Sequence, residues 1–469
     1  MNESFSPDWV QDAVFYEIFP ERFYDGDPTN DPPGTRPWGG SPTRDSFFGG
    51  DLHGILEKLS YLDNLGVDAL YLTPIFRART NHKYDTCDYL AIDPAFGSMD
   101  LLRDLVAEAH RRGIRIILDC VFNHCGDGFW AFEDVRQRGA RSPYADWFLI
   151  DSHPVRPEPA NYQTCGGAGY LPKLNVQNPA VQDYLLQVAA HWLKEAEVDG
   201  WRLDVPWKVP FDFWRAFRRT VKGVNPDAYI VGEVWRDGRL WLQGDTCDGI
   251  MNYRLRDYVL DFCVRDTMDA EDFDFELAWL RQDHEHAVPF QLNLLGSHDT
   301  PRLLTICEGN VDRMILALVF QFTYLGAPMI YYGDEVGMEG DNDPLCRGTM
   351  IWDKDRWNSQ LHETYRRLIQ IRKQHPALRR GVFEPLRVFN AVYAYHRQQE
   401  DDDVVIVLNP RQARSEFTIP LRRVARANGR WRDFLSGKTY RVQQGYLQID
   451  RLPACSALIL GPEECTSIA

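Results

Sequence analysis

Short apolar runs alternate with helix-patterned segments along the chain up to about residue 375. Between residues 52 and 65, apolar side chains recur every three or four positions and the pattern stops at Gly66, as in an amphipathic helix. The apolar runs that we interpret as buried strands are Ala13–Ile18, Ala69–Leu72, Arg115–Val121, Gly200–Leu203, Tyr229–Gly232, Gln291–Leu295 and Pro328–Tyr332. Strands that alternate with helices pair in parallel, because each parallel pair needs a crossover. About eight such repeats predict a (β/α)8 TIM barrel, an α/β fold, rather than an open sheet.

Two segments depart from this alternation. Residues 123–172 are rich in Gly, Pro, aromatic and charged residues and are too long for an ordinary loop, which predicts an inserted subdomain. After residue 377, short runs such as "AVYAYHR" and "VVIVLN" are separated by turn signals, which predicts an all-β sandwich domain. We therefore expect a catalytic barrel in two parts, 1–122 and 173–377, with the inserted subdomain at 123–172 and the C-terminal domain at 378–469.

Charge and composition exclude several classes of partner. The chain has 469 residues and a formal net charge of −16, which argues against nucleic acid and against an anionic membrane surface. The sequence contains no stretch of about 20 apolar residues, so it predicts no membrane span. The first residues show no signal-peptide pattern. The ten cysteines are scattered without metal-binding spacing. We interpret them as free thiols in a reducing compartment and expect a cytoplasmic protein, with disulfides as the alternative.

Polar residues gather at the carboxyl ends of four apolar runs. They are Asp119, Asn123 and His124, then Arg202 and Asp204, then Glu233, then His298 and Asp299. In a parallel barrel these ends converge on one face, where active sites form. Neighbouring carboxylates repel one another unless their protonation states differ, and glycoside cleavage uses such a cluster as acid, nucleophile and charge stabiliser. The alternative is that these residues form ordinary ion pairs. Their presence at the ends of four different strands makes this alternative less favoured.

The same residues carry a family resemblance. The segments "DCVFNH", "GWRLD", "VGEVW" and "LLGSHD" resemble, in order and spacing, the four signature regions of the alpha-amylase family, glycoside hydrolase family 13. The segment "LPKLN" at 171–175 resembles the fifth region, MPKLN, of the cyclomaltodextrinase, neopullulanase and maltogenic amylase branch. "NHKYDTCDY" and "IYYGDEVGM" are similar to that branch as well, and the resemblance covers essentially the whole chain.

The resemblance implies a role for each of several residues. Asp204 corresponds to the nucleophile, Glu233 to the general acid/base and Asp299 to the transition-state stabiliser. Further residues are implied in substrate binding: Arg202 beside the nucleophile, His82, His124 and His298 hydrogen-bonded to sugar hydroxyls, Tyr84 beneath the sugar ring, and Asp343 with Arg347 at the next sugar. For the last pair, a solvated ion pair is the alternative.

A loop near the start offers many oxygen ligands. Asp25, Asp27, Asn30, Asp31, the carbonyl of Gly50, and Asp51 suit a calcium ion, whereas the spacing does not fit an EF-hand. Relatives of the branch often hold calcium here, with Asn in place of Asp25. We expect one structural calcium ion, with a plain acidic turn as the alternative.

The chain departs from the branch after the nucleophile. Relatives usually have DVANE where this chain has Asp204-Val205-Pro206-Trp207-Lys208. We expect Trp207 and Lys208 on the leaving-group side, with core packing of Trp207 as the alternative. The branch also carries an N-terminal domain that builds a dimer. Since this chain begins close to its first barrel strand, we expect a monomer, or a dimer not built on such a domain.

These features predict a retaining hydrolase of alpha-1,4-glucosidic bonds in cyclodextrins, maltooligosaccharides, pullulan or starch. An alpha-glucanotransferase or a starch-type alpha-amylase is the alternative within the family. A carbohydrate-binding subunit without catalytic activity is the alternative outside enzymes.

Overall fold

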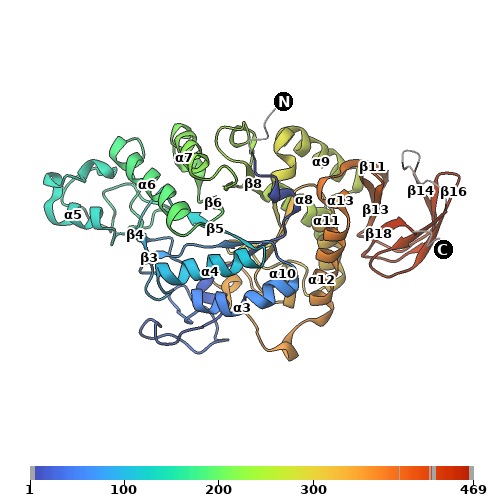
Figure 1. Ribbon diagram of the computed structural model, residues 1–469, viewed down its shortest axis with the longest axis horizontal. Helices are drawn as coiled ribbons and strands as arrows, with labels where there is room; N and C mark the ends of the chain where they lie inside the picture. Colours follow the sequence, from blue (N-terminus) through green and yellow to red (C-terminus); the bar gives the residue numbers. More distant parts are fainter. Residues whose placement is uncertain (1–5, 390, 422–423, 425–428, 464–469) are drawn as a thin grey trace.

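The structure, a computed structural model, describes residues 6–389, 391–421, 424 and 429–463. A closed barrel of parallel strands forms its centre, with helices around it (Figure 1). The segment that carries α5 (Trp130–Arg138) lies at one end of the molecule, and the C-terminal sheet lies at the other (Figure 1). No helix within the described ranges is long and apolar enough to cross a membrane.

The barrel has eight parallel strands, which confirms the predicted fold class. In chain order they are β1 (Phe15–Ile18), β2 (Ala69–Leu72), β5 (Arg115–Cys120), β6 (Gly200–Leu203), β7 (Tyr229–Val234), β8 (Gly249–Asn252), β9 (Leu292–Leu294) and β10 (Ala327–Tyr331). Each strand pairs with its neighbours in this order, and β1 closes the barrel against β10. The apolar pattern does not single out β8, because only two of its four residues have large apolar side chains.

Helices pack around the barrel between its strands. They are α1 (Trp9–Asp12), α2 (Pro20–Phe23), α3 (Leu52–Leu65), α4 (Met99–Arg111), α6 (Pro179–Glu195), α7 (Phe211–Val224), α8 (Tyr253–Val259), α9 (Ala270–His284), α10 (Leu303–Ile306), α11 (Val311–Thr323), α12 (Ser359–Gln374) and α13 (Pro376–Arg380). Helix α3 begins where Asp51 Oδ1 accepts a hydrogen bond from the Gly54 N–H at 2.7 Å. It ends at Gly66, whose φ of 96° is the left-handed conformation that glycine adopts without strain.

Two excursions leave the barrel at the carboxyl ends of its strands. After β2, the strands β3 (Phe76–Ala78) and β4 (Thr86–Ile92) form a hairpin that the apolar pattern does not predict, because its pairing is irregular. The inserted subdomain follows β5 and holds α5 with the 3₁₀ turns η1 (Gly139–Arg141) and η2 (Ala145–Trp147). His124 and Lys173 form an antiparallel bridge, so the two ends of this subdomain meet beside the barrel.

The described residues from Val382 to Pro462 form one antiparallel sheet of eight strands, which confirms an all-β C-terminal domain. Its strands are β11 (Val382–Phe389), β12 (Val392–Gln399), β13 (Asp402–Asn409), β14 (Arg414–Pro420), β15 (Gly429–Asp433), β16 (Thr439–Gln443), β17 (Tyr446–Leu452) and β18 (Ser456–Pro462). The sheet curls around its own apolar core, which includes Val405, Val407 and Trp431. It is fastened to the barrel where Arg397 Nη1 donates to the carbonyl of Thr323 in α11 at 2.6 Å.

Candidate active site

The carboxyl ends of the barrel strands surround a cleft of about 770 Å³. Eight of the residues predicted from the sequence line it: His82, Tyr84, His124, Asp204, Glu233, Asp299, Asp343 and Arg347. Arg202 and His298 are buried and lie in contact with the lining residues Asp204 and Asp299. Six different segments of the barrel therefore bring the predicted catalytic and sugar-contacting residues to one place.

Arg202 joins carboxylates from three neighbouring strands. Its Nη1 lies 3.0 Å from both oxygens of Asp119 on β5 and 3.1 Å from Asp204 Oδ1, directly after β6. Its Nη2 lies 3.0 Å from Glu233 Oε2 on β7. Burial alone would lower the pKa of Arg202, but the carboxylates, Asp119 foremost, raise it well above its ordinary value. The guanidinium therefore stays charged and fixes the positions of the carboxyl groups of Asp204 and Glu233.

Asp119 has a structural role that the sequence does not reveal. Besides Arg202, its carboxylate accepts hydrogen bonds from the hydroxyls of Tyr71, at 2.6 Å, and Tyr84, at 2.9 Å. Asp119 therefore holds the side chain of Tyr84 at the cleft as well as the arginine beneath it. Its place at the end of an apolar run marks it as unusual, but only the packing shows what it contacts.

Burial raises the pKa of the Asp204 and Glu233 carboxyl groups. The pKa of Asp204 lies well above its ordinary value, although Arg202 opposes the shift, and the pKa of Glu233 is raised by the same opposed effects. Two carboxyl groups at one guanidinium lose their protons in coupled steps. Between those steps the pair holds one proton, which is the state that offers a nucleophile and an acid together.

Glu233 is held by groups on both of its oxygens. Its Oε1 accepts a hydrogen bond from the indole N–H of Trp235 at 2.7 Å, and its Oε2 accepts one from the backbone N–H of Val205 at 2.9 Å. The Trp235 ring stacks on Tyr253 with 3.8 Å between centroids. Trp235 is a site residue that motif matching does not assign, although it lies only two positions after Glu233, directly after β7.

Asp299 lies between two cations. Its Oδ2 is 3.1 Å from His298 Nε2, and its Oδ1 is 3.1 Å from Arg347 Nη2. Burial alone would raise the pKa of Asp299, but His298 and Arg347 hold it below its usual range. Asp299 is therefore ionised at neutral pH. Arg347 Nη1 also pairs with Asp343 Oδ1 at 3.1 Å, so the predicted outer pair is joined to Asp299.

The protein already engages both ring nitrogens of His298. Nδ1 contacts Glu17 Oε1, and Nε2 lies 2.6 Å from the Tyr84 hydroxyl as well as beside Asp299. Burial alone would lower the pKa of His298, but Asp299 and Glu17 raise it to about 10. The ring is therefore an imidazolium that positions Asp299 and Tyr84. In the sequence, Glu17 is distinguished only as the single acidic residue within the first apolar run.

His82 and His124 are neutral. Burial lowers the pKa of His82 to about 3 and that of His124 to about 4. The Tyr84 backbone N–H donates to His82 Nδ1 at 3.1 Å, which leaves Nε2 as the protonated nitrogen of the ring. His82 can therefore donate a hydrogen bond from Nε2 to a sugar hydroxyl, as the sequence predicts.

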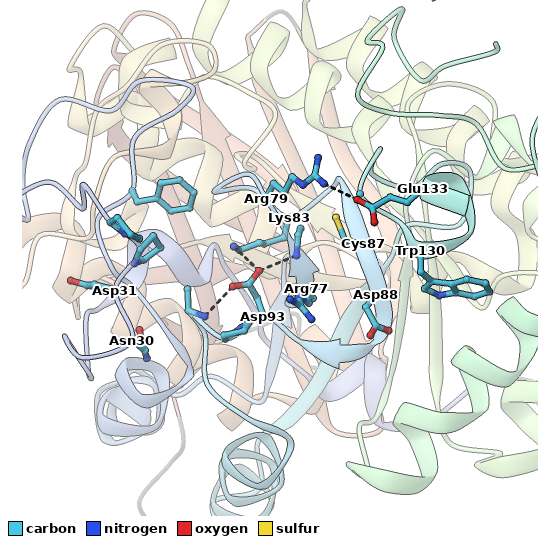
Figure 2. Close-up of a pocket in the computed structure, with 17 residues that line it drawn as sticks. Asn30, Asp31, Arg77, Arg79, Lys83, Cys87, Asp88, Asp93, Trp130 and Glu133 are labelled. Carbon is cyan, nitrogen blue, oxygen red and sulfur yellow. Dashed lines mark hydrogen bonds and ion pairs between the residues drawn. The ribbon is translucent and has the colours of Figure 1, made fainter. Parts of the chain in front are cut away.

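A buried lysine lies between His82 and Tyr84 in the chain. Lys83 has a φ of 62°, which is uncommon for a residue with a side chain, and it is directed away from the catalytic cleft into a different hollow. There its Nζ pairs with Asp93 Oδ2 at 2.9 Å (Figure 2). Asp93 Oδ2 also accepts the N–H of Ala78 at 2.9 Å. This anchored turn presents the two flanking side chains to the cleft.

The predicted calcium loop contains oxygens without hydrogen-bond partners. Asp25 Oδ1, Asn30 Oδ1 and Asp31 Oδ1 are buried and accept no hydrogen bond. Burial and the neighbouring carboxylates, Asp31 foremost, raise the pKa of Asp25 to about 6. Asp51 differs, because backbone N–H groups and the Asn30 amide already occupy its oxygens. The unpaired oxygens and crowded charge fit a hard cation.

Side-chain carboxylates alone do not complete this metal site. In the ranges that the structure describes, no three His, Cys, Asp or Glu side chains form a group that could hold a metal by themselves. A cation in this loop would therefore need the amide oxygen of Asn30 and a backbone carbonyl, such as that of Gly50, beside the aspartates.

Trp207 and Lys208 do not line the catalytic cleft. They lie in the 3₁₀ turn η3 (Pro206–Lys208) and border a separate hollow of about 400 Å³. Trp207 is 44% exposed, which is inconsistent with core packing as the reason for a tryptophan at this position. Val205, two residues earlier, lines the catalytic cleft, so the two cavities are neighbours along this segment.

Comparisons with known proteins agree with this geometry. Residues 17–358 match the family described as alpha amylase, catalytic domain. The chain is 46% identical over 458 residues to a cyclomaltodextrinase of Geobacillus thermopakistaniensis (strain MAS1), an alignment that covers 96% of this chain and 76% of that protein. It is 49% identical over 459 residues to neopullulanase 2 of Thermoactinomyces vulgaris, covering 96% and 77% respectively.

The fold is also close to that of a solved enzyme. The structure of cyclic alpha-maltosyl-(1→6)-maltose hydrolase from Arthrobacter globiformis, in complex with cyclic alpha-maltosyl-(1→6)-maltose, matches with a TM-score of 0.89 and 43% sequence identity. The match covers 97% of this chain and 100% of that one.

Proposed function

Because this chain belongs to the alpha-amylase family, glycoside hydrolase family 13, we propose that it hydrolyses alpha-1,4-glucosidic bonds with retention of anomeric configuration. The observation that carries the proposal is the position of Arg202, which contacts Asp119, Asp204 and Glu233 from three adjacent strands. A carbohydrate-binding subunit without catalysis would have no use for two buried carboxyl groups that share one proton in its cleft.

In the first step, Glu233 gives its proton to the glycosidic oxygen while the carboxylate of Asp204 attacks the anomeric carbon. The leaving sugar departs with that proton, and a covalent ester joins the remaining sugar to Asp204. The negative charge of Asp299, held between His298 and Arg347, stabilises the positive charge that develops on the sugar. In the second step, Glu233 takes a proton from water, and the water oxygen attacks the anomeric carbon. The bond to Asp204 breaks, its electron pair returns to the Asp204 carboxylate, and the alpha anomer is released.

We place the substrates among cyclodextrins, maltooligosaccharides, pullulan and starch. The similar proteins are named for cyclomaltodextrin, pullulan and a cyclic maltosyl-maltose, so both cyclic and polymeric glucans are candidates. An alpha-glucanotransferase remains a second candidate, because exposed Trp207 could bind an acceptor sugar beside the cleft. Product analysis on beta-cyclodextrin, pullulan and soluble starch side by side distinguishes hydrolysis from transfer.

Two variants test the catalytic assignment. Asp204→Asn and Glu233→Gln should each lower turnover by several orders of magnitude with an unchanged thermal unfolding profile. Asp212→Asn is a matched control, because this aspartate is 92% exposed on α7 and lies outside the cleft. If Asp204→Asn kept a tenth of the activity, another residue would have to be the nucleophile.

The proposal includes a structural calcium ion in the loop of Asp25, Asp27, Asn30, Asp31, Gly50 and Asp51. The unpaired oxygens of Asp25, Asn30 and Asp31 support it. A bound cation would neutralise the crowded aspartates and pin the loop that precedes α3, away from the reacting groups. It would take no part in bond cleavage.

The outer contacts and the location are also proposals. Asp343 and Arg347 would bind the sugar next to the cleaved one, and Trp207 and Lys208 would lie on the leaving-group side. A cytoplasmic location is supported by the nine free cysteines in the described part of the chain, since oxidising compartments favour disulfides.

A further inference from the structure

The hollow beside Trp207 has an unusual composition. Most of its walls come from two segments, with Leu149 completing them: the stretch directly after the inserted subdomain contributes Lys173, Asn175 and Gln177, and the segment after Asp204 contributes Trp207 and Lys208. The exposed indole offers a flat apolar surface on which the C–H face of a sugar can stack. The two amides offer neutral hydrogen-bonding groups.

The charge of this hollow is opposite to that of the whole chain. No acidic side chain lines it, and neither Lys173 nor Lys208 forms an ion pair with any residue in the described ranges. The chain as a whole has a net charge of −16, and acidic side chains such as Asp204, Glu233 and Asp299 line the catalytic cleft. Two cations without counter-ions in an acidic protein select for an anionic ligand.

The hollow is adjacent to the catalytic cleft. Along one wall, Leu171 lines the cleft and Lys173 lines the hollow, and along the other, Val205 lines the cleft and Trp207 lines the hollow. The charge of Lys208 also reaches the Cys165 thiol, another residue of the cleft lining. Burial and Asp204 raise the pKa of that thiol to about 11, and Lys208 opposes the shift.

We propose that this hollow binds the phosphate of a phosphorylated sugar that accepts the glycosyl group from Asp204. The inference rests on the proposed function and specifies which molecule accepts the glycosyl group. Two lysines match the double negative charge of a phosphate monoester better than the single charge of a sugar acid. Trp207 binds the sugar ring, while Lys173 and Lys208 bind the phosphate.

The transfer step is balanced without any further reactant. Glu233 removes the proton from a hydroxyl of the acceptor sugar, and that oxygen forms a bond to the anomeric carbon. The ester bond to Asp204 breaks, and the electron pair returns to the Asp204 carboxylate. The product is a phosphorylated oligosaccharide, and the next donor takes the proton from Glu233.

The test uses alpha-maltosyl fluoride as donor. One fluoride ion is released for each maltosyl group transferred to Asp204, so fluoride release measures turnover. Fluoride also leaves the hollow free for the acceptor, because no leaving sugar is bound there. Glucose, glucose 6-phosphate and glucuronic acid are offered at equal concentration, and transfer products are counted by mass spectrometry. Wild type should transfer to glucose 6-phosphate about tenfold more often than to glucose, and added salt should reduce this preference.

Variants separate the hollow from the general charge of the protein. Lys173→Gln/Lys208→Gln should lower the ratio of glucose 6-phosphate to glucose transfer to about one, and Lys208→Glu should lower it further. Lys194→Gln, at an exposed lysine of α6, should keep the wild-type ratio. Equal transfer to the two acceptors by wild type, or a preference that survives in the double variant, would overturn the inference. Transfer to glucuronic acid as efficient as to glucose 6-phosphate would overturn the match to a phosphate.

Direct binding separates this inference from the proposed function. Calorimetry with glucose 6-phosphate, glucose and inorganic phosphate should show binding of the sugar phosphate that the double variant loses. Binding of inorganic phosphate with equal affinity would overturn a site for a phosphorylated sugar. Failure of the wild type to release fluoride would contradict the hydrolase function, while the calorimetry would still decide whether the hollow binds a phosphorylated sugar.

Discussion

The backbone N–H of Val205 donates a hydrogen bond to Glu233 Oε2 at 2.9 Å. Val205 follows Asp204 directly, and its φ of 35° lies in the left-handed region, which a β-branched residue rarely occupies. Strain of this kind persists where the surrounding structure enforces it, and it occurs often at functional sites. The turn after the proposed nucleophile therefore also fixes the proposed acid/base.

Arg202 should be irreplaceable by lysine. Arg202→Lys keeps a positive charge but loses the fork that reaches Asp119, Asp204 and Glu233 at once. We expect kcat to fall by about a hundredfold or more, a loss comparable to removal of one preorganised donor. The control is Arg218→Lys, since Arg218 is a buried arginine paired with Asp248 at 2.8 Å, away from the cleft. Equal effects of the two substitutions would show that Arg202 acts only on stability.

Lys83 should stabilise the turn that carries His82 and Tyr84. Lys83→Met leaves Asp93 buried without its cation and should lower the free energy of unfolding by about 3–5 kcal/mol. The double variant Lys83→Met/Asp93→Asn should recover much of this loss, because no unpaired charge stays buried. Denaturant unfolding measures both. Losses that add in the double variant would contradict the ion pair as the source of stability.

His298 should contribute stability that depends on pH. Its pKa in the folded protein, about 10, lies above the ordinary value of 6.5, so its contribution is fully present below pH 6.5 and is lost as pH rises through about 10. The difference in Tm between wild type and His298→Gln should therefore shrink between pH 6.5 and pH 10. A constant difference across that range would mean that the ring is neutral in the folded protein.

Calcium removal should lower stability without changing the chemistry. A chelator should reduce Tm, because an ion that binds only the folded state stabilises it by mass action. Asp31→Asn removes a carboxylate whose Oδ1 has no protein partner and should weaken the response to calcium. Asp100→Asn, at a 90% exposed side chain on α4, is the matched control. An unchanged Tm in chelator, with no metal found by elemental analysis, would contradict the site.

The sequence predicts the barrel, and it predicts that the candidate catalytic residues lie together at one end of it, because both depend on local patterns. Apolar runs that end in Asp204, Glu233 and Asp299 indicate strand ends, and parallel strand ends must converge. Contacts between distant segments leave no such pattern. The partners of His298 illustrate this, since Glu17 lies 281 positions away in the chain and Tyr84 lies 214 positions away.

The exposure of a side chain and an irregular backbone conformation also cannot be predicted from the hydrophobic pattern of the sequence. Trp207 could equally have packed in the core, and only the fold shows it at the rim of a second hollow. The hairpin of β3 and β4 has irregular pairing, so it lacks the alternation that marks a strand. Lys83 is an ordinary residue in the sequence, whereas its backbone conformation and its partner Asp93 give it a role in the turn.

The most direct test of the account is to trap the sugar on Asp204. In Glu233→Gln, alpha-maltosyl fluoride can still react, because fluoride leaves without an acid, but the ester should accumulate because no base activates water. Mass spectrometry of the digested protein should find one maltosyl group on the peptide that contains Asp204. A maltosyl group on another residue, or no adduct together with beta-maltose as the first product of the wild type, would contradict a retaining mechanism through Asp204.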